Sequence, residues 1–305
     1  MKPKLVIVLG PTAVGKSDVV LELASGIGAE IINADAQQVY RQMDIGTAKP
    51  SLAEREKVPH HLIDILDPDG EFNVAMFRQL ATASANDIGR KNKAAIVCGG
   101  TGLYIRVLTQ GLFVGPAQNT AVRHTLTLEA QEHGLKTLYE RLEQVDPSAT
   151  FRIHPHDRQR IIRALEVYES TGRPISNWQE DHGFNETPFD TLKIGLCRER
   201  TELYDLIDQR CDRMIEAGLV DEVKGLSERG YSLDMKPLQS VGYKHVGWVL
   251  RGQMSLTDAV LLMKRDTRRL AKRQLTWFRS DKEIRWFHPQ ADRERIKAVV
   301  REFLN

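Results

Sequence analysis

The sequence has few cysteines and no long apolar run. Its three cysteines, Cys98, Cys197 and Cys211, lie far apart and form no CxxC pair, which leaves no disulfide framework and no paired-cysteine zinc site to infer. No apolar stretch approaches the roughly 20 residues of a membrane span, and the first strand runs directly into a glycine loop without a signal-peptide pattern. We therefore expect free thiols, no membrane contact and a cytoplasmic location.

The sequence also has almost no net charge. Its 43 basic and 41 acidic side chains give a formal charge of +2, so any affinity for nucleic acid must come from local clusters of Lys and Arg. Hydrophobic residues make up 41% of the 305 residues and charged residues 28%, with no low-complexity tract. This composition excludes extended disorder and predicts a globular protein with a large core.

Short apolar runs alternate with amphipathic stretches in the first hundred residues. The runs "KLVIVLG", "AEIINAD" and "AAIVCGG" predict strands, and "SDVVLELAS" and "NVAMFRQLATASANDIGRKN" predict helices. This order is typical of right-handed βαβ units with a parallel sheet. We expect an α/β fold, a doubly wound parallel sheet like that of P-loop NTPases.

The periodicity becomes helical between residues 113 and 188, with no strand signal. We interpret 113–188 as an inserted all-helical subdomain and 1–112 with 189–305 as the catalytic core. The core resumes with the apolar run "TLKIGLC" at 191–197 and two helical stretches that end in glycine. A basic helix is predicted over 263–279, with its apolar Leu270, Leu275 and Trp277 as anchors, followed by a short strand at "IRWF".

The clearest motif is "GPTAVGKS" at residues 10–17, which matches Gly-x-x-x-x-Gly-Lys-Ser/Thr between a strand and a helix. Such a loop directs backbone N–H groups at a phosphate, its lysine adds a charge, and its serine is a ligand for Mg²⁺. The predicted diphosphate-binding residues are Gly10, Pro11, Thr12, Ala13, Val14, Gly15, Lys16 and Ser17, with Ser17 also as the metal ligand.

Nucleotide hydrolases with this loop hold Mg²⁺ through an acid at the end of another core strand. Here the strand "AAIVCGG" ends in Cys98 and glycines, with no carboxylate. Asp35 does follow a strand, and Gln37 and Gln38 come next, which suits a planar, hydrogen-bonding substrate. General base, metal ligand and helix N-cap are the alternatives for Asp35. The loop is therefore compatible with a diphosphate that is not part of ATP.

Long strings across the chain resemble a known family. "INADAQQVYRQMDIGTAKP", "PHHLID", "GGTGLY", "HPHDRQRIIRALEVYESTGRP", "VGYK" and "TRRLAKRQLTWFR" follow the glycine loop in order, and together they resemble the bacterial tRNA dimethylallyltransferases, the tRNA prenyltransferase family. The resemblance covers nearly the whole chain. It implies transfer of a dimethylallyl group from dimethylallyl diphosphate to N6 of the adenosine immediately 3′ of the anticodon, with Mg²⁺ as cofactor.

The resemblance also implies roles for individual residues. Asp35 is the expected base, Thr101 orients the amine, and Lys16 and Arg210 stabilise the leaving diphosphate. Without the family, Thr101 is equally a capping residue in a glycine turn, and Arg210 is a solvated arginine on a helix face. The expected catalytic residues are Asp35, Thr101, Lys16 and Arg210.

The tRNA is expected to present a base flipped out of the anticodon loop. The expected partners are the tRNA anticodon stem-loop and dimethylallyl diphosphate, with no obligatory protein partner and a monomeric enzyme. From the residues alone, Gln37 and Gln38 are alternatively polar turn residues that contact no RNA. Arg160 and Arg163 are alternatively arginines on a solvated helix face. The expected tRNA-binding residues are Asp35, Ala36, Gln37, Gln38, Thr101, Arg123, Gln159, Arg160, Ile161, Ile162, Arg163, Ser240, Val241, Gly242, Tyr243, Lys244 and His245.

Three other functions remain open on the sequence. A P-loop kinase acting on a small molecule would use the same glycine loop, but it does not account for the basic insertion. An adenylate isopentenyltransferase acting on free AMP would share the loop and the base without needing to hold tRNA. A nucleic-acid-binding protein without catalysis would not depend on Lys16 or Asp35.

Overall fold

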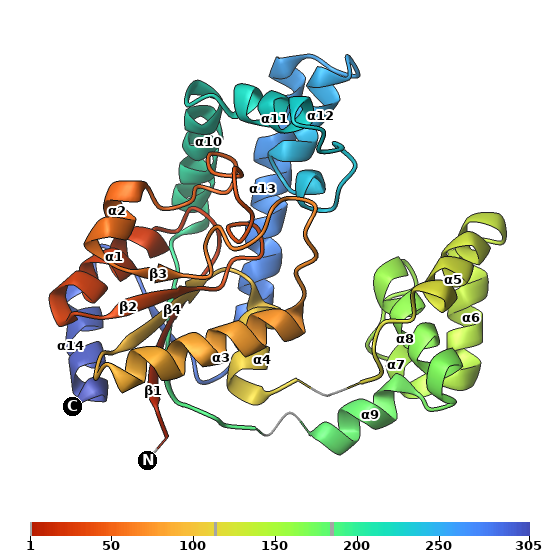
Figure 1. The fold of residues 1–305 in the computed structure, drawn as a ribbon, viewed down its shortest axis with the longest axis horizontal. Helices are drawn as coiled ribbons and strands as arrows, with labels where there is room; N and C mark the ends of the chain where they lie inside the picture. The colour runs from red at the N-terminus through yellow and green to blue at the C-terminus, as the bar shows by residue number, and fades with distance from the viewer. Residues whose placement is uncertain (1, 113–114, 184–185) are drawn as a thin grey trace. The chain divides into compact units, whose positions relative to one another are not determined.

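The computed structural model describes residues 2–112, 115–183 and 186–305. The chain forms two compact units, which we call unit 1, Met1–Thr109 with Pro188–Asn305, and unit 2, Gln110–Thr187 (Figure 1). The predicted start of the helical insertion at residue 113 lies outside the described residues. In the described ranges, no helix is both long enough and apolar enough to cross a membrane.

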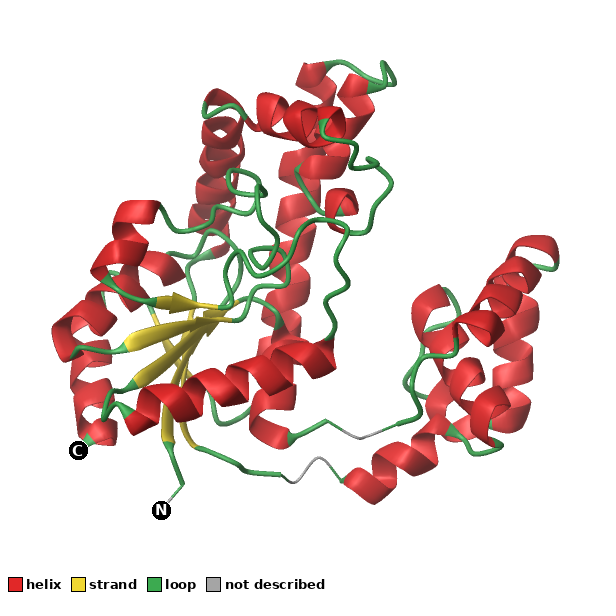
Figure 2. Cartoon of the chain, in the orientation of Figure 1, coloured by secondary structure: helices red, strands yellow, loops and turns green. Residues whose placement is uncertain are grey.

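Unit 1 is built on one sheet of six parallel strands in the order β3-β2-β4-β1-β5-β6. The strands are β1 Lys4–Leu9, β2 Glu30–Asn33, β3 His60–His61, β4 Ala95–Gly99, β5 Asp190–Leu196 and β6 Arg285–Phe287. Five of the six residues of β1 are buried, which explains its continuous apolar run, since helices cover both faces of such a sheet. The loops that follow the strands gather at one edge of the sheet (Figure 2).

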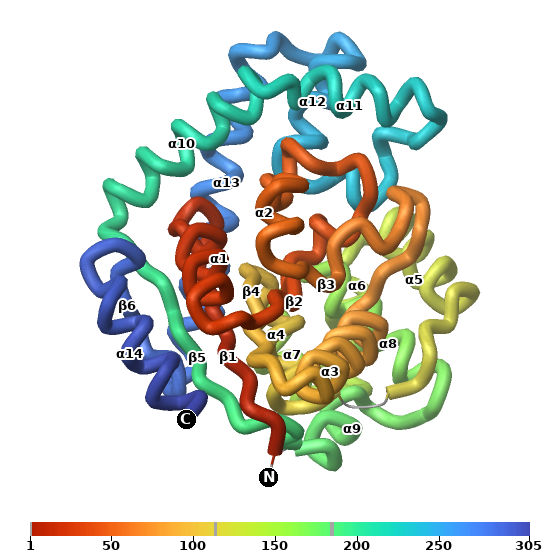
Figure 3. Tube along the Cα trace, turned by 60° about the vertical axis from the view of Figure 1, so that its left-hand side comes forward, coloured from red at the N-terminus to blue at the C-terminus, as the bar shows by residue number. Residues whose placement is uncertain are grey.

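Unit 1 also contains nine α-helices and one 3-10 helix in the described residues. α1 and α14 lie on one face and α3 lies on the other (Figures 1 and 3). The predicted doubly wound α/β core is therefore confirmed. The helices are α1 Lys16–Ile27, α2 Leu52–Lys57, α3 Val74–Arg90, α4 Gly102–Gln110, α10 Arg200–Glu216, α11 Leu219–Glu228, the 3-10 turn η1 Pro237–Gln239, α12 Tyr243–Leu250, α13 Leu256–Arg279 and α14 Arg293–Leu304.

The basic helix α13 is longer than predicted and is anchored differently. It begins at Leu256 rather than near residue 263, because the side chain of Ser255 accepts the N–H of Asp258 and caps the first turn. The expected anchors contribute only in part, since Leu270 and Leu275 are partly buried and Trp277, although its ring packs against Gly102, is 37% exposed. The buried residues of α13 are Ala259, Met263, Thr267, Ala271 and Phe278.

Acidic residues of α10 neutralise part of α13. Lys264 pairs with Asp212 at 2.7 Å, and Arg268 pairs with Asp208. Arg265 and Arg269 both lie near Asp266, at 3.2 and 3.7 Å. Within this basic stretch the sequence shows a single acid, Asp266. The acids of α10 add to it, so the net positive charge around α13 is lower than the sequence suggests. Among the residues that the structure describes, the α13 cations with no acidic partner are Lys272, Arg273 and Arg279.

The glycines of "GGTG" let three segments approach closely at the end of β4. A Cβ atom on Gly99 would lie 2.2 Å from the carbonyl oxygen of Ala34, which follows β2. On Gly100 a Cβ would lie 2.4 Å from Nε2 of Gln274, and on Gly102 it would lie 2.2 Å from the Trp277 ring. The turn thus brings β2, β4 and α13 together.

Unit 2 is all helical in its described residues. Its core contains mainly leucine and isoleucine, including Leu138, Leu142, Ile161 and Leu165. Asp146 is buried and its carboxylate accepts the N–H groups of Ala149 and Ser176, which fixes the ends of two helices. The helices are α5 Thr120–Glu132, α6 Leu135–Val145, α7 Pro147–Thr150, α8 Arg158–Thr171 and α9 Ile175–His182.

We expect Gly99→Ala to lower the free energy of unfolding by about 2 kcal/mol or more, because its new methyl group meets backbone that cannot move aside as a side chain can. Gly26→Ala is the matched control, since a Cβ there meets nothing within 4 Å in α1. That control should gain up to about 1 kcal/mol from helix propensity. Urea unfolding of both variants measures the difference, and equal midpoints would contradict the close approach.

Candidate active site

The segment 10–17 joins β1 to α1 as a glycine loop. Ala13 and Gly15 have left-handed backbone conformations, with φ of 63° and 101°, and Gly15 precedes α1 without any side-chain cap. In the described part of the chain, the amides of Ala13, Val14 and Gly15 donate to no protein acceptor. Unpaired amides of this kind at a helix N-terminus form a concavity that binds anions.

Lys16 is held against the same loop. Its Nζ donates to the carbonyl oxygens of Gly10 at 3.0 Å and Pro11 at 2.8 Å. Burial lowers the pKa of Lys16 from 10.5 to about 8, the Arg210 guanidinium lowers it further, and the Asp35 carboxylate acts to raise it. In the described residues, the partly buried ammonium is therefore stabilised by neutral carbonyls rather than by a close ion pair.

A cavity of about 320 Å³ lies beside the loop. Residues from β2, β4, α10, α13 and the loop line it, so five separate parts of unit 1 contribute to one site. Burial raises the pKa of Cys98 to about 11, so the end of β4 offers a neutral thiol where many hydrolases have an acid. The lining includes Lys16, Ser17, Asp35, Cys98, Arg210 and Gln274.

Asp35 and Arg210 bring opposite charges to this cavity. One carboxylate oxygen of Asp35 accepts the N–H of Gln37 at 2.8 Å, which fixes the side chain in a local turn rather than a helix cap. Burial lowers the pKa of Arg210, and the Asp35 carboxylate opposes that shift. Asp35, Arg210 and Lys16 therefore line one cavity, and the Asp35 carboxylate acts on the pKa of both cations.

Thr101 ties the end of β4 to the segment that carries Asp35. Its Oγ1 accepts the N–H of Ala36 at 3.2 Å, and its own N–H donates to the carbonyl of Ala34 at 3.3 Å. Its carbonyl accepts the N–H groups of Tyr104 and Ile105 at the start of α4. Thr101 thus has the capping contacts of a turn residue, and its hydroxyl hydrogen is not used by them.

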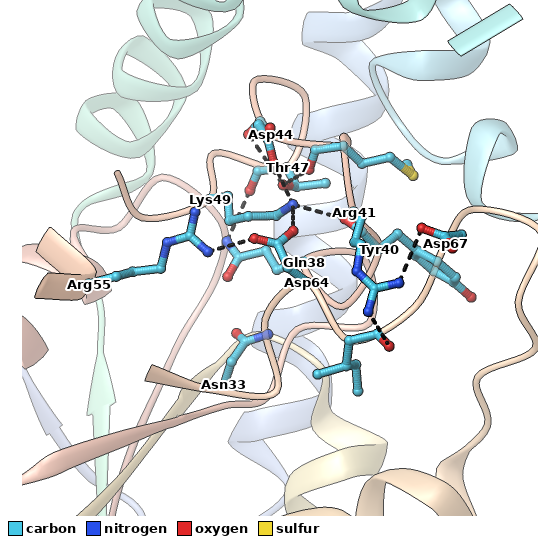
Figure 4. A network of polar contacts seen from close by, with 12 residues as sticks. Asn33, Gln38, Tyr40, Arg41, Asp44, Thr47, Lys49, Arg55, Asp64 and Asp67 are labelled. Atoms are coloured by element: carbon cyan, nitrogen blue, oxygen red, sulfur yellow. Dashed lines mark hydrogen bonds and ion pairs between the residues drawn. The ribbon is translucent and has the colours of Figure 1, made fainter. Parts of the chain in front are cut away.

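A buried lysine organises the loop that follows Asp35. Lys49 is 1% exposed, and its Nζ donates to the carbonyl of Tyr40 at 2.8 Å and to the carboxylates of Asp64, at 2.6 Å, and Asp44. Arg55 donates to the second oxygen of Asp64 (Figure 4). Burial acts to raise the pKa of Asp64, but these two hydrogen bonds hold it below its usual value.

Gln38 and Glu222 complete this support. The Gln38 amide donates to the carbonyls of Thr47 and Ala48, each at 3.1 Å. The Glu222 carboxylate of α11 accepts three consecutive backbone N–H groups, those of residues 44–46, at 2.7–3.2 Å. It also accepts the Tyr243 hydroxyl at 2.6 Å. The Gln38 side chain is therefore already used within the protein.

The segment 240–245 is partly internal. Tyr243 is 1% exposed and His245 is 0% exposed, so direct contact of either ring with RNA is excluded by burial. Nδ1 of His245 accepts the N–H of Gly242, and burial lowers the pKa of His245 to about 4, which keeps the ring neutral. The tRNA contacts predicted for this segment are therefore limited to its partly exposed residues, Ser240, Val241 and Lys244.

The arginines predicted in unit 2 have different surroundings. Arg123 and Arg163 both donate to the buried carboxylate of Glu166, at 2.6 and 3.0 Å. Ile161 and Ile162 lie in the core of the unit, so the structure contradicts a contact between their side chains and RNA. Arg160 is exposed and has only an Asp157 pair at 3.3 Å, and Gln159 is exposed beside it.

Four important side chains were missed from the sequence. Gln274 bonds to the glycine loop and to Gly100. Arg198 donates to the carbonyl of Val14 at 3.0 Å. Lys49 and Glu222 hold the loop after Asp35. Lys49 does lie in the family string "GTAKP", but its position in the sequence does not reveal its contact with Asp64. The position of Glu222 likewise does not reveal its contact with the loop.

Comparisons with known proteins agree on one family. The model described as IPP transferase matches residues 38–281. The tRNA dimethylallyltransferase of Geobacter metallireducens is 51% identical, covering 99% of this chain and 98% of the relative. That of Syntrophobacter fumaroxidans is 50% identical, covering 98% and 87%.

Solved structures give the same result. A tRNA isopentenylpyrophosphate transferase from Bacillus halodurans is 39% identical with a TM-score of 0.74, covering 99% of this chain and 97% of its own. A eukaryotic dimethylallyltransferase acting on tRNA is 28% identical with a TM-score of 0.84, covering 99% and 79%. On this similarity over its whole length, the chain belongs to the IPP transferase family.

Proposed function

We propose that this protein transfers a dimethylallyl group from dimethylallyl diphosphate to N6 of the adenosine immediately 3′ of the tRNA anticodon, releasing diphosphate. The observation that carries the proposal is one cavity lined by the anion-binding loop, Asp35 and Arg210, with the neutral Cys98 at the end of β4. The names of the relatives, tRNA dimethylallyltransferases, support it.

The donor side follows from the loop. The unpaired amides of residues 13–15, Lys16 and Arg210 would surround the diphosphate, and negative charge grows on its bridging oxygen as the C–O bond to the dimethylallyl carbon breaks. Preorganised donors at such an oxygen are worth roughly 3 kcal/mol each. Thr12 contributes through its side chain, because Gln274 already accepts its N–H.

Ser17 is the residue we assign to Mg²⁺. The described residues contain no cluster of three or more His, Cys, Asp or Glu that could hold a metal. A hydroxyl at the start of α1, beside the Asp35 carboxylate in the same cavity, still fits Mg²⁺, which takes few protein ligands and completes its shell with substrate phosphates and waters. When bound, the ion would neutralise charge on the leaving diphosphate.

The acceptor side follows from Asp35 and Thr101. The N6 amine of adenine is a weak nucleophile because its lone pair is delocalised into the ring, so a base must remove a proton as the C–N bond forms. Asp35 is that base. Thr101 holds the amine in place by accepting one N6–H on the Oγ1 lone pair that its contact to Ala36 leaves available.

The tRNA is held by partly exposed side chains. Gln159 and Arg160 of α8, with Val241 and Lys244, are the predicted contacts whose side chains remain accessible, whereas the Ser240 hydroxyl oxygen is buried. The carboxyl-terminal cations of α13 add phosphate contacts. Arg123, Arg163 and Gln38 act indirectly, by shaping the surfaces that carry these groups. A monomeric state and a cytoplasmic location remain predictions.

We expect Asp35→Asn to abolish transfer while binding of a tRNA anticodon stem-loop stays within about twofold of wild type, because the amide is isosteric but cannot accept the proton. Transfer is measured with labelled dimethylallyl diphosphate and no ATP, and binding by filter retention. Wild-type turnover in the variant would contradict the base assignment.

The same assay separates the alternative functions. A kinase would phosphorylate with ATP and transfer no prenyl group. An adenylate isopentenyltransferase would use free AMP in preference to the stem-loop. A non-catalytic RNA-binding protein would give no product from either acceptor.

We expect the affinity for inorganic diphosphate to fall as pH rises through about 8. Burial depresses the pKa of Lys16 to about 8, so the free protein loses this charge above that pH, whereas a bound anion favours the protonated amine. Calorimetric titrations at about pH 7 and about pH 9.5 measure the change. Lys16→Met is the control that corrects for ionisation of diphosphate itself; the same pH dependence in both proteins would exclude Lys16 as the cause.

Arg160 and Arg163 should give different defects although they are three residues apart. Arg160→Ala removes an exposed cation, so we expect weaker tRNA binding with unchanged stability. Arg163→Ala leaves Glu166 buried with one arginine fewer, so we expect a loss of about 1–3 kcal/mol in unfolding free energy. Thermal unfolding and stem-loop binding measured on both variants test this; a stable Arg163→Ala variant with weak RNA binding would reverse the assignment.

A further inference from the structure

We propose that Gln274 is a positioning residue that sets the spacing between the phosphate loop and the turn at residues 99–101. Its side chain lies in the wall of the candidate active site, and it comes from α13, a helix remote in sequence from both segments. The inference rests on the proposed function, because those two segments would carry the donor and the acceptor of the transfer.

The amide of Gln274 bonds to both segments at once. Oε1 accepts the backbone N–H of Thr12 at 2.9 Å. Nε2 donates to the backbone carbonyl of Gly100 at 3.0 Å. An uncharged amide is one of the few side-chain groups that both accept and donate in one plane. It therefore links the loop after β1 to the turn after β4 through a single rigid group.

The contact at Thr12 also decides which amides face the diphosphate. The N–H of Thr12 is taken by Gln274, whereas those of Ala13, Val14 and Gly15 have no acceptor in the described residues. An anion in the loop would therefore bind from residue 13 onward. Gln274 thus occupies one loop amide, and the three amides left to bind the diphosphate stay in place when Gln274 is lost.

Gly100 provides the space for this amide. A Cβ on Gly100 would lie 2.4 Å from Nε2 of Gln274, so any other residue there would displace the amide. Because the atom displaced is the end of a flexible side chain, this change would move Gln274 rather than unfold the turn. The loop and the turn that carries Thr101 then lose this link beyond the last paired residues of β1 and β4, Leu9 and Gly99, so their separation is held less tightly.

The chemical consequence concerns the bond being formed. The dimethylallyl carbon must lie close to N6 while its diphosphate remains in the loop, and displacement of reacting groups by about 1 Å costs up to about a hundredfold in rate. Binding of each substrate alone does not depend on that separation. Loss of the Gln274 link should therefore lower kcat and leave the two affinities almost unchanged.

The first experiment is Gln274→Met, which keeps the length of the side chain and removes both hydrogen bonds. We expect kcat for transfer to the stem-loop to fall by about tenfold or more, with dissociation constants for stem-loop and dimethylallyl diphosphate within about twofold of wild type. Gln253→Met, at an exposed position just before α13, is the matched control and should keep full activity. Unchanged kcat in Gln274→Met would overturn the proposal.

Two further variants distinguish positioning from a general loss of structure. Gly100→Ala should reproduce the kcat defect, and the double variant with Gln274→Met should be no worse than either single one, because both remove the same link. Additive losses would contradict a shared cause. Gln274→Glu should recover activity relative to Gln274→Met as pH falls, since a protonated carboxyl again donates to Gly100 and accepts from Thr12. A constant ratio across pH would also count against the link.

Wild-type protein in the same assay separates this inference from the function on which it rests. If wild type forms no prenylated stem-loop, the proposed function fails. If wild type is active and Gln274→Met equals it, only the positioning role fails.

Discussion

Lys16 holds a partly buried ammonium group at the edge of a cavity that the guanidinium of Arg210 also lines. Like charges in a partly dry site destabilise the fold unless something offsets them, and here the offset comes from two loop carbonyls and the Asp35 carboxylate. Much of the surrounding architecture follows from this requirement. The loop must keep its amides free, Asp35 must lie nearby, and neighbouring segments must hold both in place.

The segments that meet this requirement come from distant parts of the chain. Glu222 in α11 accepts the amides of residues 44–46, while Lys49 bonds to Asp64 within the same irregular region. Gln274 in α13 reaches the loop before α1. The site is therefore supported mainly by side-chain contacts to backbone, a kind of contact that depends on the position of each element and not on its local conformation.

This explains what the sequence could predict. Strands buried on both faces appear as apolar runs, and the phosphate loop is contiguous, so the parallel sheet and residues 10–17 could be identified directly. The two-residue strand β3 has no periodicity to detect. The cap Ser255 followed by Asp258 was a visible signal for the true start of α13. Gln274 and Glu222 could not be assigned, because their partners lie as much as 262 residues away, and burial of Ile161, Tyr243 and His245 depends on tertiary packing.

The pairing of α10 acids with α13 cations has a kinetic consequence. Lys264 and Arg268 are neutralised inside unit 1, and in the described part of the chain the cations of this helix without an acidic partner are Lys272, Arg273 and Arg279. The helix therefore releases fewer counterions than its seven cations suggest when it meets a polyanion. Because few counterions are released, nonspecific binding of RNA to this helix is weak and short-lived. An enzyme that must leave each modified RNA and find an unmodified one among many similar molecules gains turnover from that restraint.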